Sequence, residues 1–118
     1  MDTRKTILVY QYAERIKSEL IIASDLLAKM LTLTGEERTG AEKMMRSYLA
    51  ALAREIKIAQ NIEKSVNFVG AEKKVVEATG RLRLTEYSEI NRCISEALSF
   101  ITTSCHAAME ALEQEQLI

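Results

Sequence analysis

The spacing of apolar residues between positions 87 and 112 constrains the fold of this chain more than any other feature. The apolar positions recur there in steps of seven, four, three, four, three and four residues: Tyr87, Ile94, Leu98, Ile101, Cys105, Ala108 and Leu112. Such steps place these side chains on one face of an α-helix. The pattern is typical of the buried seam of a left-handed helix bundle, so it predicts one long helix in such a bundle.

Three more helices are expected before this one. The spacing predicts a first helix from about Thr3 to Leu33, a second from about Ala41 to near Lys64, and a shorter third from about Ala71 to Thr79. The residues expected to break or cap the helices are Gly35, Ser65, Asn67, Gly70, Gly80 and Thr85. The predicted fold class is therefore all-α, an antiparallel up-and-down four-helix bundle that forms a single domain over residues 1–118.

Residues that catalytic and metal sites need are scarce. The chain has one histidine, His106, and two cysteines, Cys93 and Cys105. A zinc or di-iron site needs more ligands at suitable spacing. Cys105 and His106 are adjacent, so on a helix they point about 100° apart. We therefore expect no enzyme activity, no catalytic residue, no metal site and no cofactor, with Cys105 in the core and His106 at its boundary.

The two thiols and the apolar runs bear on localisation. Cys93 and Cys105 are twelve residues apart on one expected helix, which separates them by about 18 Å and prevents a disulfide there. The longest uncharged run, residues 97–109, has thirteen residues and is too short to span a bilayer. The apolar patch before Glu14 is too short for a cleavable signal. These features predict a cytoplasmic protein with no membrane partner.

A stripe of five cations marks the expected second helix. At 100° per residue they fall within an arc of roughly 80° opposite the apolar face: Lys43, Arg46, Arg54, Lys57 and Lys64. The fourth helix is acidic and the net charge is −1, so any attraction to nucleic acid must come from this local asymmetry. A charged helix face is most often only a solvated surface. The alternatives are phosphate contact and docking of an acidic partner, such as the acidic helix of a neighbouring subunit.

Several residues are difficult to place in a monomer. Ile7, Tyr10 and Ile21 lie off the apolar stripe of the first helix, so a monomer would expose them and we expect them at an oligomer contact. Glu19 and Glu55 project into the apolar arcs of the first and second helices. One interpretation is a paired-carboxylate site, and the simpler one is a polar contact across helices.

Two segments resemble known four-helix families. GEERTGAEKMMRSYLAALAREIKIAQNI, residues 35–62, is similar to the turn and second helix of the S23 family, proteins encoded in 23S rRNA intervening sequences. LRLTEYSEINRCISEALSFI, residues 82–101, resembles the last-helix motif of the Avd family, the accessory variability determinants of diversity-generating retroelements. The tyrosine, apolar and acidic positions of that motif correspond here to Tyr87, Ile90, Cys93, Ile94 and Glu96. The glycines and tryptophan that end the motif are replaced by Thr102, Thr103 and Ser104.

This resemblance implies a four-helix protomer in a ring-like homo-oligomer, commonly a pentamer. It also implies a role in binding RNA, DNA or a reverse transcriptase, although Avd proteins are markedly basic and this chain is not. We therefore expect a non-catalytic accessory or scaffold protein that holds a nucleic acid or a nucleic-acid enzyme through the basic face of the second helix. The alternative is a helical adaptor or regulator that acts only through protein–protein contacts.

Overall fold

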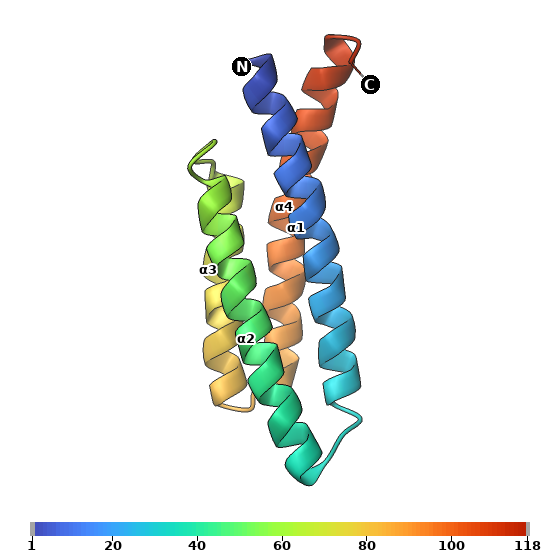
Figure 1. Cartoon of the computed structure of the whole chain (residues 1–118), viewed down its shortest axis with the longest axis vertical. Coiled ribbons are helices and arrows are strands. Elements are labelled where there is room, and N and C mark those ends of the chain that lie inside the picture. Colours follow the sequence, from blue (N-terminus) through green and yellow to red (C-terminus); the bar gives the residue numbers. More distant parts are fainter. Residues whose placement is uncertain (1, 118) are drawn as a thin grey trace.

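Four long α-helices make up nearly all of residues 2–117, the part of the chain that the computed structural model describes (Figure 1). They are α1 (Thr3–Met30), α2 (Gly35–Ala59), α3 (Val66–Arg83) and α4 (Tyr87–Gln114). Within that range there is no β-strand. The prediction of an all-helical chain with four helices is thus confirmed.

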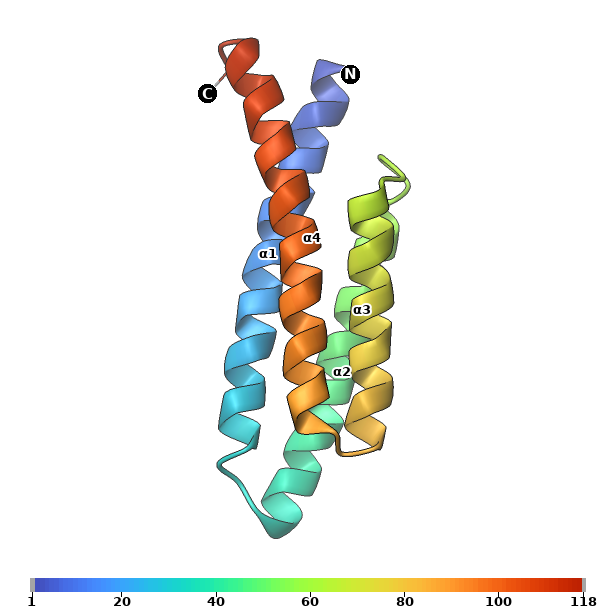
Figure 2. The same ribbon diagram turned by 180° about the vertical axis from the view of Figure 1, so that it is seen from behind.

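The helices lie around one elongated core. α1 and α3 each contact α2 and α4, and the particle measures 53 × 22 × 18 Å. α1 and α4 extend beyond α2 and α3 at the end where both chain termini lie (Figures 1 and 2). Among residues 2–117, none of the helices combines the length and the apolar character that a membrane crossing requires.

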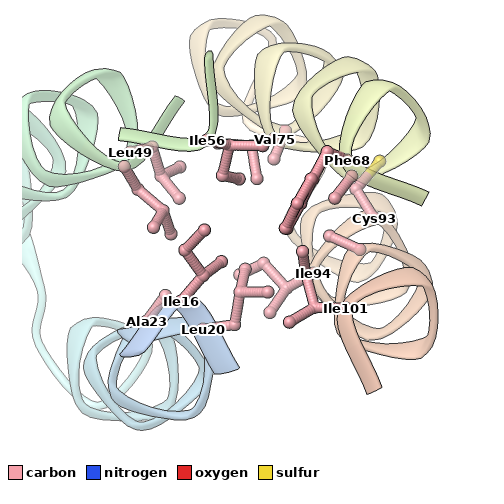
Figure 3. Packing of buried hydrophobic residues seen from close by; sticks show 14 of the residues in the cluster. Ile16, Leu20, Ala23, Leu49, Ile56, Phe68, Val75, Cys93, Ile94 and Ile101 are labelled. Carbon is pink, nitrogen blue, oxygen red and sulfur yellow. The ribbon is translucent and has the colours of Figure 1, made fainter. Parts of the chain in front are cut away.

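The core draws large side chains from all four helices (Figure 3). The fully buried ones include Ile16, Leu20, Leu49, Ile56, Phe68, Val75, Ile94 and Ile101. Each buried apolar side chain of this size contributes about 1.5–3 kcal/mol to folding relative to an exposed one. The seam predicted for α4 is correct at most of its positions, because Ile94, Ile101, Cys105, Ala108 and Leu112 are all buried.

Several apolar residues do not lie where the periodicity placed them, among them Tyr87 of the predicted α4 seam, which is only half-buried. Leu98 of α4 is only half-buried, whereas Cys93 and Ala97 are fully buried. α4 contacts both α1 and α3, so its buried face is wider than one seam and extends around to Cys93 and Ala97. Helical spacing places Leu8 in the apolar stripe of α1 and Met44 in that of α2, yet they are 36% and 75% exposed.

Arg38 closes the turn between α1 and α2. Its Nε donates to the Leu33 carbonyl and its Nη2 to the Leu31 carbonyl, both at 2.8 Å. Since these carbonyls are satisfied from α2, α1 ends at Met30 rather than continuing to Leu33 as predicted. Gly35 has a φ of +60°, which suits glycine. It is the first residue of α2, however, so α2 begins earlier than predicted.

A serine cap starts α3. α2 ends at Ala59 and not near Lys64, and α3 begins at Val66, before the predicted start. The Ser65 hydroxyl accepts a hydrogen bond from the Phe68 N–H at 3.1 Å. Serine disfavours a helix interior but is preferred at the N-cap, so the segment expected to weaken a helix instead starts one.

The turn between α3 and α4 uses a strained threonine. α3 continues through Gly80 to Arg83, so Gly80 is not the cap that the sequence predicted. Thr85 has a φ of +56°, and the Glu86 N–H donates to the Arg81 carbonyl at 3.0 Å, which is the bond of a Schellman motif. The residue that precedes α4 as its N-cap is Glu86 and not Thr85.

Candidate nucleic-acid interface

The predicted basic stripe runs along α2 and into the connection that follows it. Lys43, Arg54, Lys57 and Lys64 are exposed, and Arg46 is half-buried. Because α2 ends at Ala59, Lys64 belongs to the α2–α3 connection rather than to the helix. We call these five residues the basic stripe.

The basic stripe is not neutralised within residues 2–117. None of its five side chains forms an ion pair with a described Asp or Glu. The buried Nε of Arg46 also has no hydrogen-bond partner among these residues. Cations without a nearby carboxylate keep their potential available to an incoming anion.

Cations between α3 and α4 are arranged in the opposite way. Arg92 lies 2.7 Å from both Glu89 and Glu96 and 3.4 Å from Glu77. Lys74 lies 3.3 Å from Glu96 and 3.5 Å from Glu77. The acidic residues in the N-terminal half of α4 are therefore largely paired with cations of the same chain. A neighbouring basic stripe would have to dock against carboxylates nearer the C-terminal end of α4.

Two cations of α3 extend the same face. Arg83 lines a hollow of about 420 Å³ together with Ala50 and Ala53 of α2, and Lys73 lines another hollow with Lys64. Lys73 and Arg83 are exposed, and within the described chain neither forms an ion pair. The sequence did not indicate that Lys73 and Arg83 extend the basic stripe, because the sequence of α3 alone does not show which of its faces lies beside α2.

The residues predicted at an oligomer contact are only partly exposed. Ile7 and Ile21 are 37% and 47% exposed, while Tyr10 is half-buried and packs against the core. Ile7 and Ile21 therefore remain available to a neighbour. Whether a neighbour covers them stays a prediction.

A second exposed apolar surface lies between α1 and α2. Ile22 and Leu26 of α1 and Met44 of α2 are 47%, 39% and 75% exposed. Leu26 and Met44 line a hollow of about 310 Å³ together with Tyr48. The sequence did not indicate this surface, because the periodicity assigned Met44 to the core.

Glu19 and Glu55 meet across the α1–α2 interface. Arg15 Nε lies 2.6 Å from Glu55 Oε1 and 3.6 Å from Glu19 Oε1, and the two carboxyl side chains are 15% and 26% exposed. The Tyr48 hydroxyl donates to the backbone carbonyl of Glu19 at 3.0 Å. Burial, assisted by the Glu55 carboxyl, raises the pKa of Glu19 from 4.5 to about 7. The predicted polar contact across helices is confirmed.

Both thiols are buried beside carboxylates. Cys105 Sγ donates to Glu14 Oε1 at 2.8 Å, and burial together with this bond raises the pKa of Cys105 to about 11. Burial also raises the pKa of Cys93 to about 11. Such thiols stay protonated at neutral pH and are poor nucleophiles. His106 is exposed, 3.1 Å from Glu110, so Cys105 lies in the core as predicted but His106 lies outside its boundary.

No metal-binding constellation is found among residues 2–117. Within that part of the chain, no group of three or more His, Cys, Asp or Glu side chains could hold a metal ion. The candidate functional features of the described residues are thus the basic stripe, the half-buried carboxyl pair, and the apolar surface between α1 and α2.

Comparison with protein-family models, with curated proteins and with solved structures returns no match for this chain. The resemblance to the S23 and Avd families therefore stays a prediction from the motifs in residues 35–62 and 82–101.

Proposed function

We propose that this chain is the protomer of a ring-like homo-oligomer, a pentamer by its resemblance to the Avd family, and that each protomer is an antiparallel up-and-down four-helix bundle. The assembly acts as a non-catalytic accessory or scaffold protein in the cytoplasm. It binds RNA, or an enzyme that acts on nucleic acid such as a reverse transcriptase, through the basic stripe of α2.

The lack of ion pairs along the basic stripe carries this proposal. Among residues 2–117, the stripe and its extension on α3 have no carboxylate partner, whereas Lys74 and Arg92 are paired with neighbouring glutamates. Unpaired cations also occur elsewhere on the surface, and what distinguishes the stripe is that its unpaired cations gather on one face of α2. Such a cluster suits phosphate contact, because an unpaired cation can neutralise a phosphate directly, whereas a paired cation must first leave its carboxylate.

Repetition around an oligomer would compensate for the weak charge of one protomer. The chain has a net charge of −1, so a single stripe binds a polyanion weakly. Several copies of the stripe on one particle raise the effective affinity without any new contact. Exposed Ile7 and Ile21 supply apolar surface for such an assembly.

A triple alanine variant of Lys43, Arg54 and Lys57 tests the stripe directly. These three side chains are exposed, and Arg46 is left in place because its Nε is buried. Labelled structured RNA is titrated at about 50 and 200 mM salt. We expect the variant to bind more weakly and its salt slope to fall by about one for each phosphate contact removed.

The matched control replaces Arg4, Lys5 and Lys29 of α1 with alanine. These cations are also exposed and unpaired within the described residues, so the loss of net charge is the same while the stripe stays intact. We expect the control to bind RNA like the wild type. Equal losses in both variants, or no binding by the wild type at the lower salt, would refute the assignment of RNA binding to the stripe.

The exposed apolar surface between α1 and α2 favours a second candidate function. Met44 is 75% exposed beside a hollow of about 310 Å³, and methionine-rich grooves suit partner helices. An adaptor that acts only through protein contacts would use this surface. It would lose partner binding in Met44→Glu and keep it in the triple stripe variant.

A further inference from the structure

A groove between α3 and α4 adjoins the end of the basic stripe. Lys64 lines it together with Lys73, and its apolar wall includes Val66, Val69 and the ring of Phe100. Its volume is about 580 Å³, enough for a ligand the size of a nucleotide. Lys64 and Lys73 form no ion pair with any described carboxylate. The groove thus combines unpaired positive charge with apolar and aromatic surface.

The Phe100 ring stands between two hollows. It lines the groove just described and also a hollow of about 390 Å³ that includes Asn67, Ser99 and Thr103. The tip of the ring packs against Gly70, where an added Cβ would lie only 2.7 Å from Phe100 Cζ. Gly70 therefore lets the ring tip approach the α3 backbone, so that phenyl surface borders the hollow on each side.

We propose that this groove binds an unpaired nucleotide of single-stranded RNA, with its base against Phe100 and its phosphates beside Lys64 and Lys73. The inference rests on the proposed function and adds the class of nucleic acid to it. Lys64 belongs to both the basic stripe and the groove, so the two surfaces form one path for a polyanionic strand.

The chemistry of the groove distinguishes a single strand from a duplex. Two lysines attract the phosphates of either form. A base stacks favourably on an aromatic or apolar wall only when its face is uncovered, whereas the bases of a duplex stay stacked on one another. An acidic peptide would use the lysines without needing the ring, so the contribution of Phe100 separates the two kinds of ligand.

Phe100→Leu tests the groove, since it keeps apolar volume and removes the aromatic face. Labelled single-stranded RNA and the same strand annealed to its complement are titrated at about 50 mM salt. We expect Phe100→Leu to weaken single-strand binding roughly 5- to 150-fold, the range for loss of one stacked base. Duplex binding stays unchanged. Leu98→Ala, at another half-buried position of α4, is the matched control and binds both forms like the wild type.

A fluorescence measurement gives a second reading of the same contact. The chain has four tyrosines but no tryptophan, so Phe100→Trp introduces a single indole in the groove, which can be excited apart from the tyrosines. We expect single-stranded RNA to quench its emission, because stacked bases quench indole, and we expect duplex RNA to leave it unchanged.

The outcomes separate this inference from the proposed function. Suppose that the wild type binds both RNA forms, that Phe100→Leu binds the single strand as tightly as the wild type, and that the single strand does not quench Phe100→Trp. The groove assignment is then wrong, while RNA binding by the stripe stands. Equal losses of single-strand and duplex binding in Phe100→Leu would also overturn it. If the wild type binds neither form, the proposed RNA binding and the groove fail together.

Discussion

The carboxyl pair of Glu19 and Glu55 predicts that the folded state loses stability as the pH rises from about 5 to about 8. Burial, assisted by Glu55, raises the pKa of Glu19 from 4.5 to about 7 in the folded state. The folded chain therefore keeps this proton at a pH where the unfolded chain has lost it. The stabilisation is complete below about pH 4.5 and disappears as the pH passes about 7.

The size of this effect follows from the pKa and the exposure of the pair. A rise from 4.5 to about 7 corresponds to at most about 3 kcal/mol. The Glu19 side chain is 26% exposed, so water reduces both the cost of burial and the repulsion from Glu55, and we expect about 1–2 kcal/mol. The lowered pKa values of Glu14 and Glu77 affect stability only at lower pH, outside this window.

Glu19→Gln is the variant that checks this reasoning, because glutamine resembles the protonated acid and does not titrate. Urea unfolding gives the free energy of unfolding at pH 5 and pH 8. We expect the free energy of unfolding of the variant to stay the same between pH 5 and pH 8, and to exceed that of the wild type by about 1–2 kcal/mol at pH 8. Glu113→Gln, at an exposed site of α4, should follow the wild type.

The opposite result would have a clear meaning. If Glu19→Gln is less stable than the wild type at pH 8, the ionised carboxylate stabilises the fold, and its pairing with Arg15, 3.6 Å away, outweighs the cost of its burial. A wild type whose stability is the same at pH 5 and pH 8 would likewise refute the raised pKa of Glu19 in the folded state.

Three further predictions concern stability and reactivity. Ile101→Ala should cost about 2–5 kcal/mol because Ile101 is fully buried, and half-buried Leu98→Ala should cost about 1 kcal/mol; equal losses in urea unfolding would contradict the buried face of α4. Thr85→Gly should stabilise the fold by about 1 kcal/mol, since its φ is +56°, and a lower melting temperature would argue against strain. Cys93 and Cys105, whose pKa values are raised to about 11, should react with a thiol reagent only after denaturation, so fast labelling of native protein would contradict their burial.

Helical periodicity was enough to predict that four helices form, but not where they end. The seam residues Ile94, Ile101 and Leu112 were predicted because burial on one helix depends on local spacing. The ends depend on groups supplied from elsewhere in the fold. Arg38 satisfies carbonyls just beyond the end of α1, and a residue five to seven positions further on in another helix carries no signature of that role.

For the surface features too, local spacing predicted which residues share a helix face, but not what the other helices bring beside it. The basic stripe could be predicted because its residues share one helix or adjoin it. Its lack of ion pairs could not be predicted, because it depends on which side chains α3 and α4 bring nearby. The contact of Phe100 with Gly70 joins two helices, so neither segment alone indicates it. Helical spacing wrongly placed Leu8 and Met44 in buried stripes for a related reason, since the positions of the neighbouring helices decide which apolar residues are covered.

The extension of α1 and α4 beyond α2 and α3 implies a gradient of local opening along the molecule. At that end these two helices have no α2 or α3 beside them (Figures 1 and 2), so fewer contacts must break before their amides exchange with solvent. Around Ile94 and Leu49 all four helices share the core (Figure 3), and exchange there requires opening of the whole fold. Native-state hydrogen exchange should therefore be fast at the extended end and slowest in the middle of the helices. A ligand that binds only the folded extended end would slow exchange there most visibly, while it raises the free energy of global unfolding by the same amount.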